Sequence, residues 1–110
     1  MKILSQKQGH MVKVSISGKM DAVTAPDFES ALSGIIAQGE LKLLIDLSGL
    51  EYISSAGLRA ILVVAKELRG KEGEMLFVGL QDRVQDVFRI SGFYSIFRIF
   101  LTEDEILKQI

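Results

Sequence analysis

Two adjacent hydroxyl groups, on Ser54 and Ser55, are the first candidates for chemistry in this chain. They lie in YISSAGL, residues 52–58, between an apolar run and a helical pattern of aliphatic residues. One serine is explained as a helix N-cap, which accepts a hydrogen bond from a first-turn amide. Gly57 needs another reason, because glycine there weakens a helix by roughly 1 kcal/mol relative to alanine. An anion bound close to the free amides and tight packing against a strand explain it equally well.

The alternative function for such a serine is that of the nucleophile in a serine hydrolase. The nucleophile-elbow pattern G-x-S-x-G is missing around Ser55, which lies in ISSAG and is followed by Ala56. The only histidine, His10, falls in an expected hairpin turn, where a solvated side chain is favoured over a general base. We therefore expect a binding protein without catalytic residues, and we keep the hydrolase as the less favoured alternative.

Metal and nucleotide sites have little support in the sequence. The chain has no cysteine and one histidine, and the acidic run 103–105 fits the start of a helix better than a metal site. Neither G-x-x-x-x-G-K-[ST] nor G-x-G-x-x-G occurs. We expect no metal and no cofactor, and a small ligand- or nucleotide-binding regulatory module stays open as an alternative.

Length and charge limit the class of protein. A chain of 110 residues that is 48% hydrophobic predicts one domain over residues 1–110. The 13 basic and 14 acidic residues are scattered, which argues against nucleic acid as a partner. No apolar run approaches the roughly 20 residues of a membrane span, and no signal-peptide pattern opens the chain. We expect a cytoplasmic protein that binds other proteins or small ligands and does not bind membranes.

Alternating and apolar runs predict five strands. The predicted ranges are 3–8, 11–17, 41–47, 75–78 and 97–101. Gly9 and His10 join the first two as a hairpin. The third is dense in aliphatic residues, as in a strand covered on both faces, and Ser48 and Gly49 are expected to form the turn after it.

Helical spacing predicts four helices between and after these strands. A capping box at residues 24–27, with Pro26 inside it, starts the first helix, which carries Phe28, Leu32, Ile35 and Ile36 and ends at Gly39. The second helix has an apolar stripe of Leu58, Ile61, Leu62, Ala65 and Leu68 and ends near Gly70. The third helix carries Leu80, Val84, Val87 and Phe88. The last helix starts at residues 102–105 and carries Ile106, Leu107 and Ile110. The aromatic residues Phe93, Tyr94, Phe97 and Phe100 are assigned to the core. Strand, helix and strand in this order predict parallel crossovers, so the fold class is a single-domain α/β sandwich with a mixed central sheet and about four helices.

The segment LLIDLSGLEYISSAGLRAIL, residues 43–62, resembles the signature of the STAS domain. Bacterial anti-sigma-factor antagonists and the cytosolic tails of sulfate transporters share that domain. The segments GKMD, residues 18–21, and MLFVG, residues 75–79, resemble flanking parts of the same family, and the length favours the stand-alone antagonist type.

The resemblance implies a phosphorylation switch at Ser55. In the family, an anti-sigma factor with serine kinase activity phosphorylates the matching serine, the unphosphorylated domain binds that kinase and releases the sigma factor, and a phosphatase resets the cycle. The family usually has aspartate where this chain has Ser54, which makes Ser54 the alternative acceptor. Asp21 and Asp46 match acidic positions of the family pattern, although a turn residue and an acceptor for turn amides also explain them.

The predicted partner-binding residues surround the two serines. They are Asp21, Ser54, Ser55, Ala56, Gly57, Arg59 and Val63. Ala60 and Val64 also lie off the expected core stripe, and exposure or contact with a neighbouring helix explains them equally well. A phosphate adds about −1.5 to −2 charges, which a helix N-terminus tolerates but a bound partner does not.

Overall fold

The computed structural model, which describes residues 1–108, builds its sheet from the alternating and aliphatic runs. Strands β1 (Lys2–Gln8) and β2 (Met11–Met20) pair antiparallel from Lys2 opposite Ser17 to Gln8 opposite Met11. Strands β3 (Lys42–Ile53), β4 (Glu74–Val78) and β5 (Arg98–Phe100) follow in parallel, so the order is β1-β2-β3-β4-β5. The predicted mixed sheet and its five strands are confirmed.

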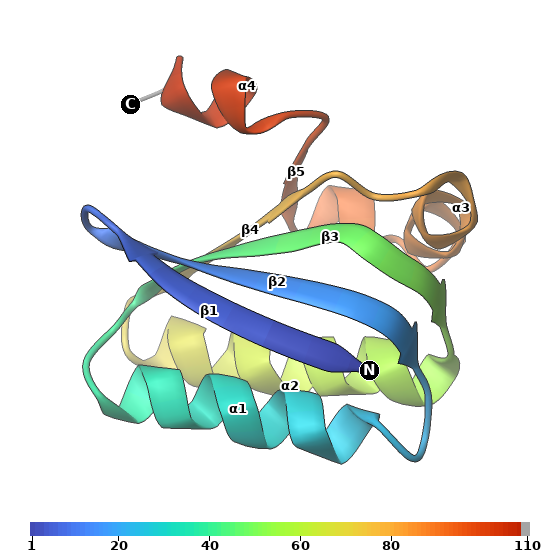
Figure 1. The fold of residues 1–110 in the computed structure, drawn as a ribbon, viewed down its shortest axis with the longest axis horizontal. Coiled ribbons are helices and arrows are strands. Elements are labelled where there is room, and N and C mark those ends of the chain that lie inside the picture. Colours follow the sequence, from blue (N-terminus) through green and yellow to red (C-terminus); the bar gives the residue numbers. More distant parts are fainter. Residues whose placement is uncertain (109–110) are drawn as a thin grey trace.

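Helices cover the two faces of the sheet unequally. The long helices α1 (Ala25–Ala37) and α2 (Ser55–Gly70) lie side by side along one face, as Figure 1 shows. Helix α3 (Asp82–Ile90) adds Val84 and Phe88 to the core on that face, and a 3₁₀ turn, η1 (Phe93–Ser95), follows it. The short helix α4 (Glu103–Leu107) packs on the opposite face through Ile106. These elements confirm the predicted α/β class with four helices.

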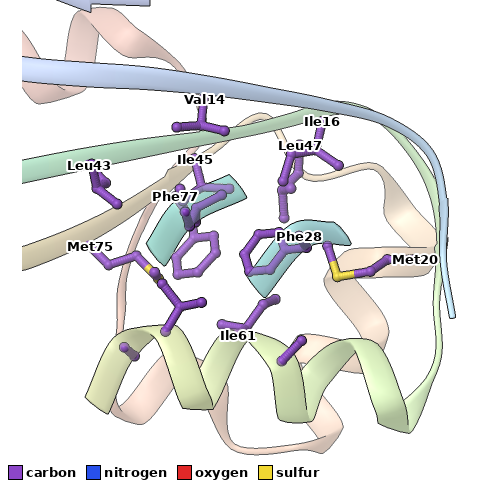
Figure 2. Packing of buried hydrophobic residues seen from close by; sticks show 14 of the residues in the cluster. Val14, Ile16, Met20, Phe28, Leu43, Ile45, Leu47, Ile61, Met75 and Phe77 are labelled. Atoms are coloured by element: carbon purple, nitrogen blue, oxygen red, sulfur yellow. The ribbon is translucent and has the colours of Figure 1, made fainter. Parts of the chain in front are cut away.

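Side chains of alternate strand residues separate the two faces. Leu43, Ile45 and Phe77 point into the large core (Figure 2), where Phe28 of α1 and Ile61 of α2 meet them. The neighbouring residues Leu44, Leu76 and Val78 form a smaller cluster with Phe100 and Ile106. This alternation confirms that β3 is covered on both faces.

Aromatic rings fill the core beside α3. Phe77 meets Phe88 edge-to-face at 5.4 Å between ring centroids, and Phe93 and Phe97 meet at 5.2 Å. The assignment of Phe93, Phe97 and Phe100 to packing is therefore confirmed. The same assignment is wrong for Tyr94, which is 40% exposed and lies below the guanidinium group of Arg89.

The turn expected at Ser48 and Gly49 does not occur, because β3 continues to Ile53. The register with β2 shifts there: Ser15 pairs with Asp46, but Ser17 pairs with Gly49, so β3 bulges by one residue. The Asp46 carboxylate accepts a hydrogen bond from the Ser48 amide at 2.9 Å. A Cβ on Gly49 would lie 2.7 Å from that of Ser17, so the glycine allows close strand pairing and makes no turn.

The predicted capping box at residues 24–27 is also wrong, although α1 begins where it was expected, with Pro26 in its first turn. Thr24 has helical dihedral angles, φ −93° and ψ −21°, and its side chain makes no cap hydrogen bond. Its hydroxyl instead accepts from the Asp21 amide and donates to the Lys19 carbonyl, both at 2.9 Å. In the last helix, Leu107 is 66% exposed, and the expected contribution of Ile110 lies outside the described residues.

Candidate functional site

Ser54 is the N-cap of α2, and its hydroxyl and its amide are both hydrogen-bonded. Its backbone is extended, with φ −95° and ψ 175°, and its Oγ accepts a hydrogen bond from the Gly57 amide at 3.3 Å. Its amide donates to the Met20 carbonyl at 2.9 Å, which ties the start of α2 to the end of β2. Ser54 is half-buried as a result.

Ser55 is the first residue of α2 and is exposed. Within residues 1–108 its hydroxyl makes no hydrogen bond. It lies at the helix end where free amides and the helix dipole favour negative charge. The two neighbouring serines therefore differ: Ser54 closes the helix, and Ser55 presents a free hydroxyl to solvent.

Gly57, two residues after Ser55, is buried against two strands. A Cβ at this position would come within 2.7 Å of Ile53 Cγ1 and 2.9 Å of the Met20 carbonyl oxygen. Of the two explanations for this glycine, the structure supports tight packing. The close-packed backbone keeps the start of α2 fixed on the ends of β2 and β3.

Asp21 organises the loop between β2 and α1. Its Oδ1 accepts from the amides of Val23 and Thr24, at 3.0 and 3.1 Å, and from the Thr24 hydroxyl at 3.2 Å. The hydrogen bond from the Thr24 amide and, to a smaller extent, that from Val23 hold the pKa of the Asp21 carboxyl below its ordinary value of 3.8. Asp21 is thus a turn residue, and it lies next to Met20, which bonds Ser54.

Asp46 belongs to a different part of the structure. Besides the Ser48 amide, it contacts Lys13, with 3.6 Å between Nζ and Oδ2, and Lys13 in turn pairs with Glu103 of α4. The hydrogen bond with Glu103 raises the pKa of the Lys13 ammonium. Asp46 and Lys13 therefore help to hold α4 and are not contacts of the α2 N-terminus.

The outer face of α2 differs from the predicted stripe. Ala60 and Val64 are buried, at 2% and 0% exposure, so of the explanations left open for them the structure supports contact with neighbouring elements. Leu62, expected in the core, is 38% exposed. The buried stripe is displaced because α2 packs against α1 as well as the sheet, and Ser33 of α1 donates a hydrogen bond to Glu67 of α2 at 3.1 Å.

The predicted partner-binding residues divide by exposure. Ser55, Arg59 and Val63 face solvent; Asp21, Ser54 and Ala56 are half-buried; Gly57 is buried. The structure therefore leaves Ser55, Arg59 and Val63 as an open strip on one helix. Gly57 has a structural role in supporting that strip and offers no surface to a partner.

Two further surface features were missed from the sequence. Val23, in the loop organised by Asp21, is 83% exposed, and no periodic pattern marks a single loop residue. A hollow of about 400 Å³ is lined by Lys19, Asp21, Glu51, Tyr52 and Arg83. Its residues come from β2 and the loop after it, from β3 and from α3; the strand register, in which Lys19 pairs with Tyr52, brings the first two segments together, and the packing of α3 adds Arg83.

The rival chemistries gain no support from the geometry. His10 lies in the β1–β2 turn, at the other end of the ten-residue strand β2 from Met20, which is roughly 30 Å away at 3.3 Å per residue. It cannot act as a base for Ser55 (Figure 1). Among residues 1–108, no three His, Cys, Asp or Glu side chains gather as metal ligands, and no helix is long and apolar enough to cross a membrane.

Comparison with known proteins places this arrangement in a family. BtrV of Bordetella bronchiseptica, which bears the provisional name of an anti-sigma factor antagonist, is 40% identical over 99 residues, covering 90% of this chain and 85% of BtrV. The crystal structure of an anti-sigma factor antagonist from Mycobacterium paratuberculosis is 29% identical with a TM-score of 0.88, covering 99% of this chain and 92% of that one. The Bacillus protein SpoIIAA in its phosphorylated form shares the fold, with 18% identity and a TM-score of 0.74 over 99% of this chain and all of the other.

The family model agrees with these similarities. The STAS domain model matches residues 2–106, from the first residue of β1 to α4. The match includes the β3–α2 junction that carries the two serines. This chain therefore belongs to the STAS domain family.

Proposed function

We propose that this protein is an anti-sigma factor antagonist whose binding is switched off by phosphorylation of Ser55. The observation that carries the proposal is the free, exposed Ser55 hydroxyl at the N-terminus of α2, beside a Ser54 whose hydroxyl serves as the cap. The names of BtrV and of the Mycobacterium antagonist support the partner class.

Ser55 is the better acceptor of the two serines. A kinase must reach the hydroxyl and rotate it toward the γ-phosphate, and Ser55 has no bond to break. Phosphorylation of Ser54 would remove the cap of α2 and force a half-buried side chain outward. The proposed kinase is the anti-sigma factor itself, and a phosphoserine phosphatase returns the chain to its binding form.

The proposed switch acts through charge on a rigid surface. A phosphate on Ser55 meets the free amides of the helix, which is worth about 0.3 to 1 kcal/mol within the isolated domain. A partner packed on the strip of Ser55, Arg59 and Val63 would bury about −1.5 to −2 charges, of which the single positive charge of Arg59 balances only part, and burying the remainder is far more costly. The fold therefore tolerates the phosphate and the complex does not.

In this proposal the chain is a binding protein and not an enzyme, and the position of the only histidine, His10, at the far end of β2 from Ser55 supports that reading. It works as one domain over residues 1–110 and needs no cofactor. Its place is the cytoplasm, because sigma factors and the proteins that control them act where RNA polymerase is.

The proposal is tested with a purified anti-sigma factor and ATP. We expect one phosphate by intact mass, mapped to Ser55 by fragmentation and lost in Ser55→Ala. Ser54→Asp is the matched control, because aspartate keeps an acceptor for the Gly57 amide but has no hydroxyl to modify. Full phosphorylation of Ser55→Ala, or its loss in Ser54→Asp, would move the site to Ser54.

A further inference from the structure

Val23 is an exposed apolar side chain on a rigid loop. It is 83% exposed, yet its amide donates to Asp21 Oδ1 at 3.0 Å. The next residue, Thr24, is fixed by its amide on the same carboxylate and by its hydroxyl on the Lys19 carbonyl at 2.9 Å. A surface loop with an apolar tip is ordinarily loose, whereas this one is held on both sides of the tip.

The same loop is joined to the start of α2. The Met20 carbonyl, three residues before Val23, accepts from the Ser54 amide at 2.9 Å. Gly57 packs so closely on Met20 that no Cβ fits between them. Val23 and Ser55 are therefore joined through Met20 into one unit, by a backbone hydrogen bond and by close packing.

We infer that Val23 is an apolar anchor for the anti-sigma factor, inserting into an apolar socket of that partner while Ser55 is unphosphorylated. This inference rests on the proposed function and adds a contact residue to it. A valine has few rotamers to lose, and its backbone is already ordered, so the entropy lost on binding is small. Filling a partner's apolar socket with Val23 would also remove its exposed apolar surface from water, which favours binding.

The position of the anchor also gives phosphorylation its effect. Because the loop and the α2 N-terminus form one unit, the partner cannot keep Val23 in its socket and swing away from Ser55. The complex must then either bury the charge on Ser55 or lose the contact with Val23. A flexible loop would allow a partner to keep the apolar contact and avoid the phosphate.

The test compares two truncations of exposed aliphatic side chains, by titration against an anti-sigma factor that the wild-type chain binds. We expect Val23→Ala to lower the affinity about tenfold, which is about 1.4 kcal/mol, and Val23→Ile to keep it. Leu101→Ala is the control, because Leu101 is 71% exposed and lies between β5 and α4, away from α2 (Figure 1). Both alanine variants should have the same melting temperature as the wild type, since substitutions of exposed residues change stability little.

The outcomes separate the inference from the function on which it rests. If the wild type binds and Val23→Ala binds equally well, the anchor is wrong and the proposed function stands. An equal loss in Leu101→Ala would also overturn it, since the effect would not belong to the loop. If the wild type binds no anti-sigma factor, the proposed function fails and the inference fails with it.

Discussion

The N-terminus of α2 and the region of α4 use polar groups in opposite ways. At α2, the Ser54 amide is bonded to the Met20 carbonyl, the Gly57 amide to the Ser54 hydroxyl and the Val23 amide to Asp21, while the side chains of Ser55 and Val23 face solvent. At α4, charged side chains pair across elements, from Asp46 through Lys13 to Glu103. The first arrangement builds a rigid, open surface, and the second fastens a five-residue helix. The surface proposed for a partner is thus the one whose internal hydrogen bonds leave the side chains of Ser55 and Val23 unbonded within residues 1–108.

The largest expected effect is on stability at the α4 end. Ile106→Ala removes a side chain that is 3% exposed and packs with Leu44, Leu76 and Phe100. We expect a loss of about 2 to 4 kcal/mol in the free energy of unfolding, measured by chemical denaturation. Binding of the anti-sigma factor and phosphorylation of Ser55 should stay at wild-type levels under native conditions. A large loss of affinity in this variant would contradict the separation of the two regions.

Gly57→Ala is expected to cause a smaller loss of stability than Ile106→Ala, but it should also change the structure around Ser55. The new Cβ would meet Ile53 Cγ1 and the Met20 carbonyl at under 3 Å, so the start of α2 must shift. We expect about 1 to 3 kcal/mol of destabilisation in the same denaturation measurement, together with weaker partner binding.

Gly34→Ala is the matched control for this substitution. Gly34 lies inside α1 with nothing within 4 Å of the added Cβ, so alanine there should stabilise the protein by roughly 0.5 to 1 kcal/mol. If Gly57→Ala were as stable as the wild type, the close contact with β2 would not be what requires glycine.

The sequence was sufficient to predict the helices and strands, but not the contacts between them. The hairpin at Gly9, the buried β3 and the α2 start at Ser54 follow from local patterns that need no partner element, and the structure has all three. The bulge after Asp46 was missed because it depends on the register with β2, which no local pattern contains.

The side of α2 that is buried was misjudged for a similar reason. The stripe of buried residues was predicted as if α2 packed on a single element. Helix α2 packs on both α1 and the sheet, so Ala60 and Val64 are buried and Leu62 is exposed. At the site, Ser54 and Ser55 could be found from their spacing. Val23 could not, because its significance comes from hydrogen bonds to Asp21 and from the link between Met20 and Ser54.

The smallest expected effect is the pH dependence that Asp21 gives to its loop. Its pKa in the folded chain lies below 3.8 because the carboxylate accepts hydrogen bonds from Thr24 and Val23, so the unfolded chain binds a proton more readily. The resulting stabilisation is complete above about pH 3.8 and is lost as the pH falls through the lower folded value. Asp21→Asn keeps an oxygen acceptor but cannot titrate, so its free energy of unfolding, measured by urea denaturation from pH 6 to pH 2, should fall less steeply than that of the wild type. Every other carboxylate titrates in both proteins and cancels in the difference. A difference that stays constant down to pH 2 would show that Asp21 does not hold the loop through its charge.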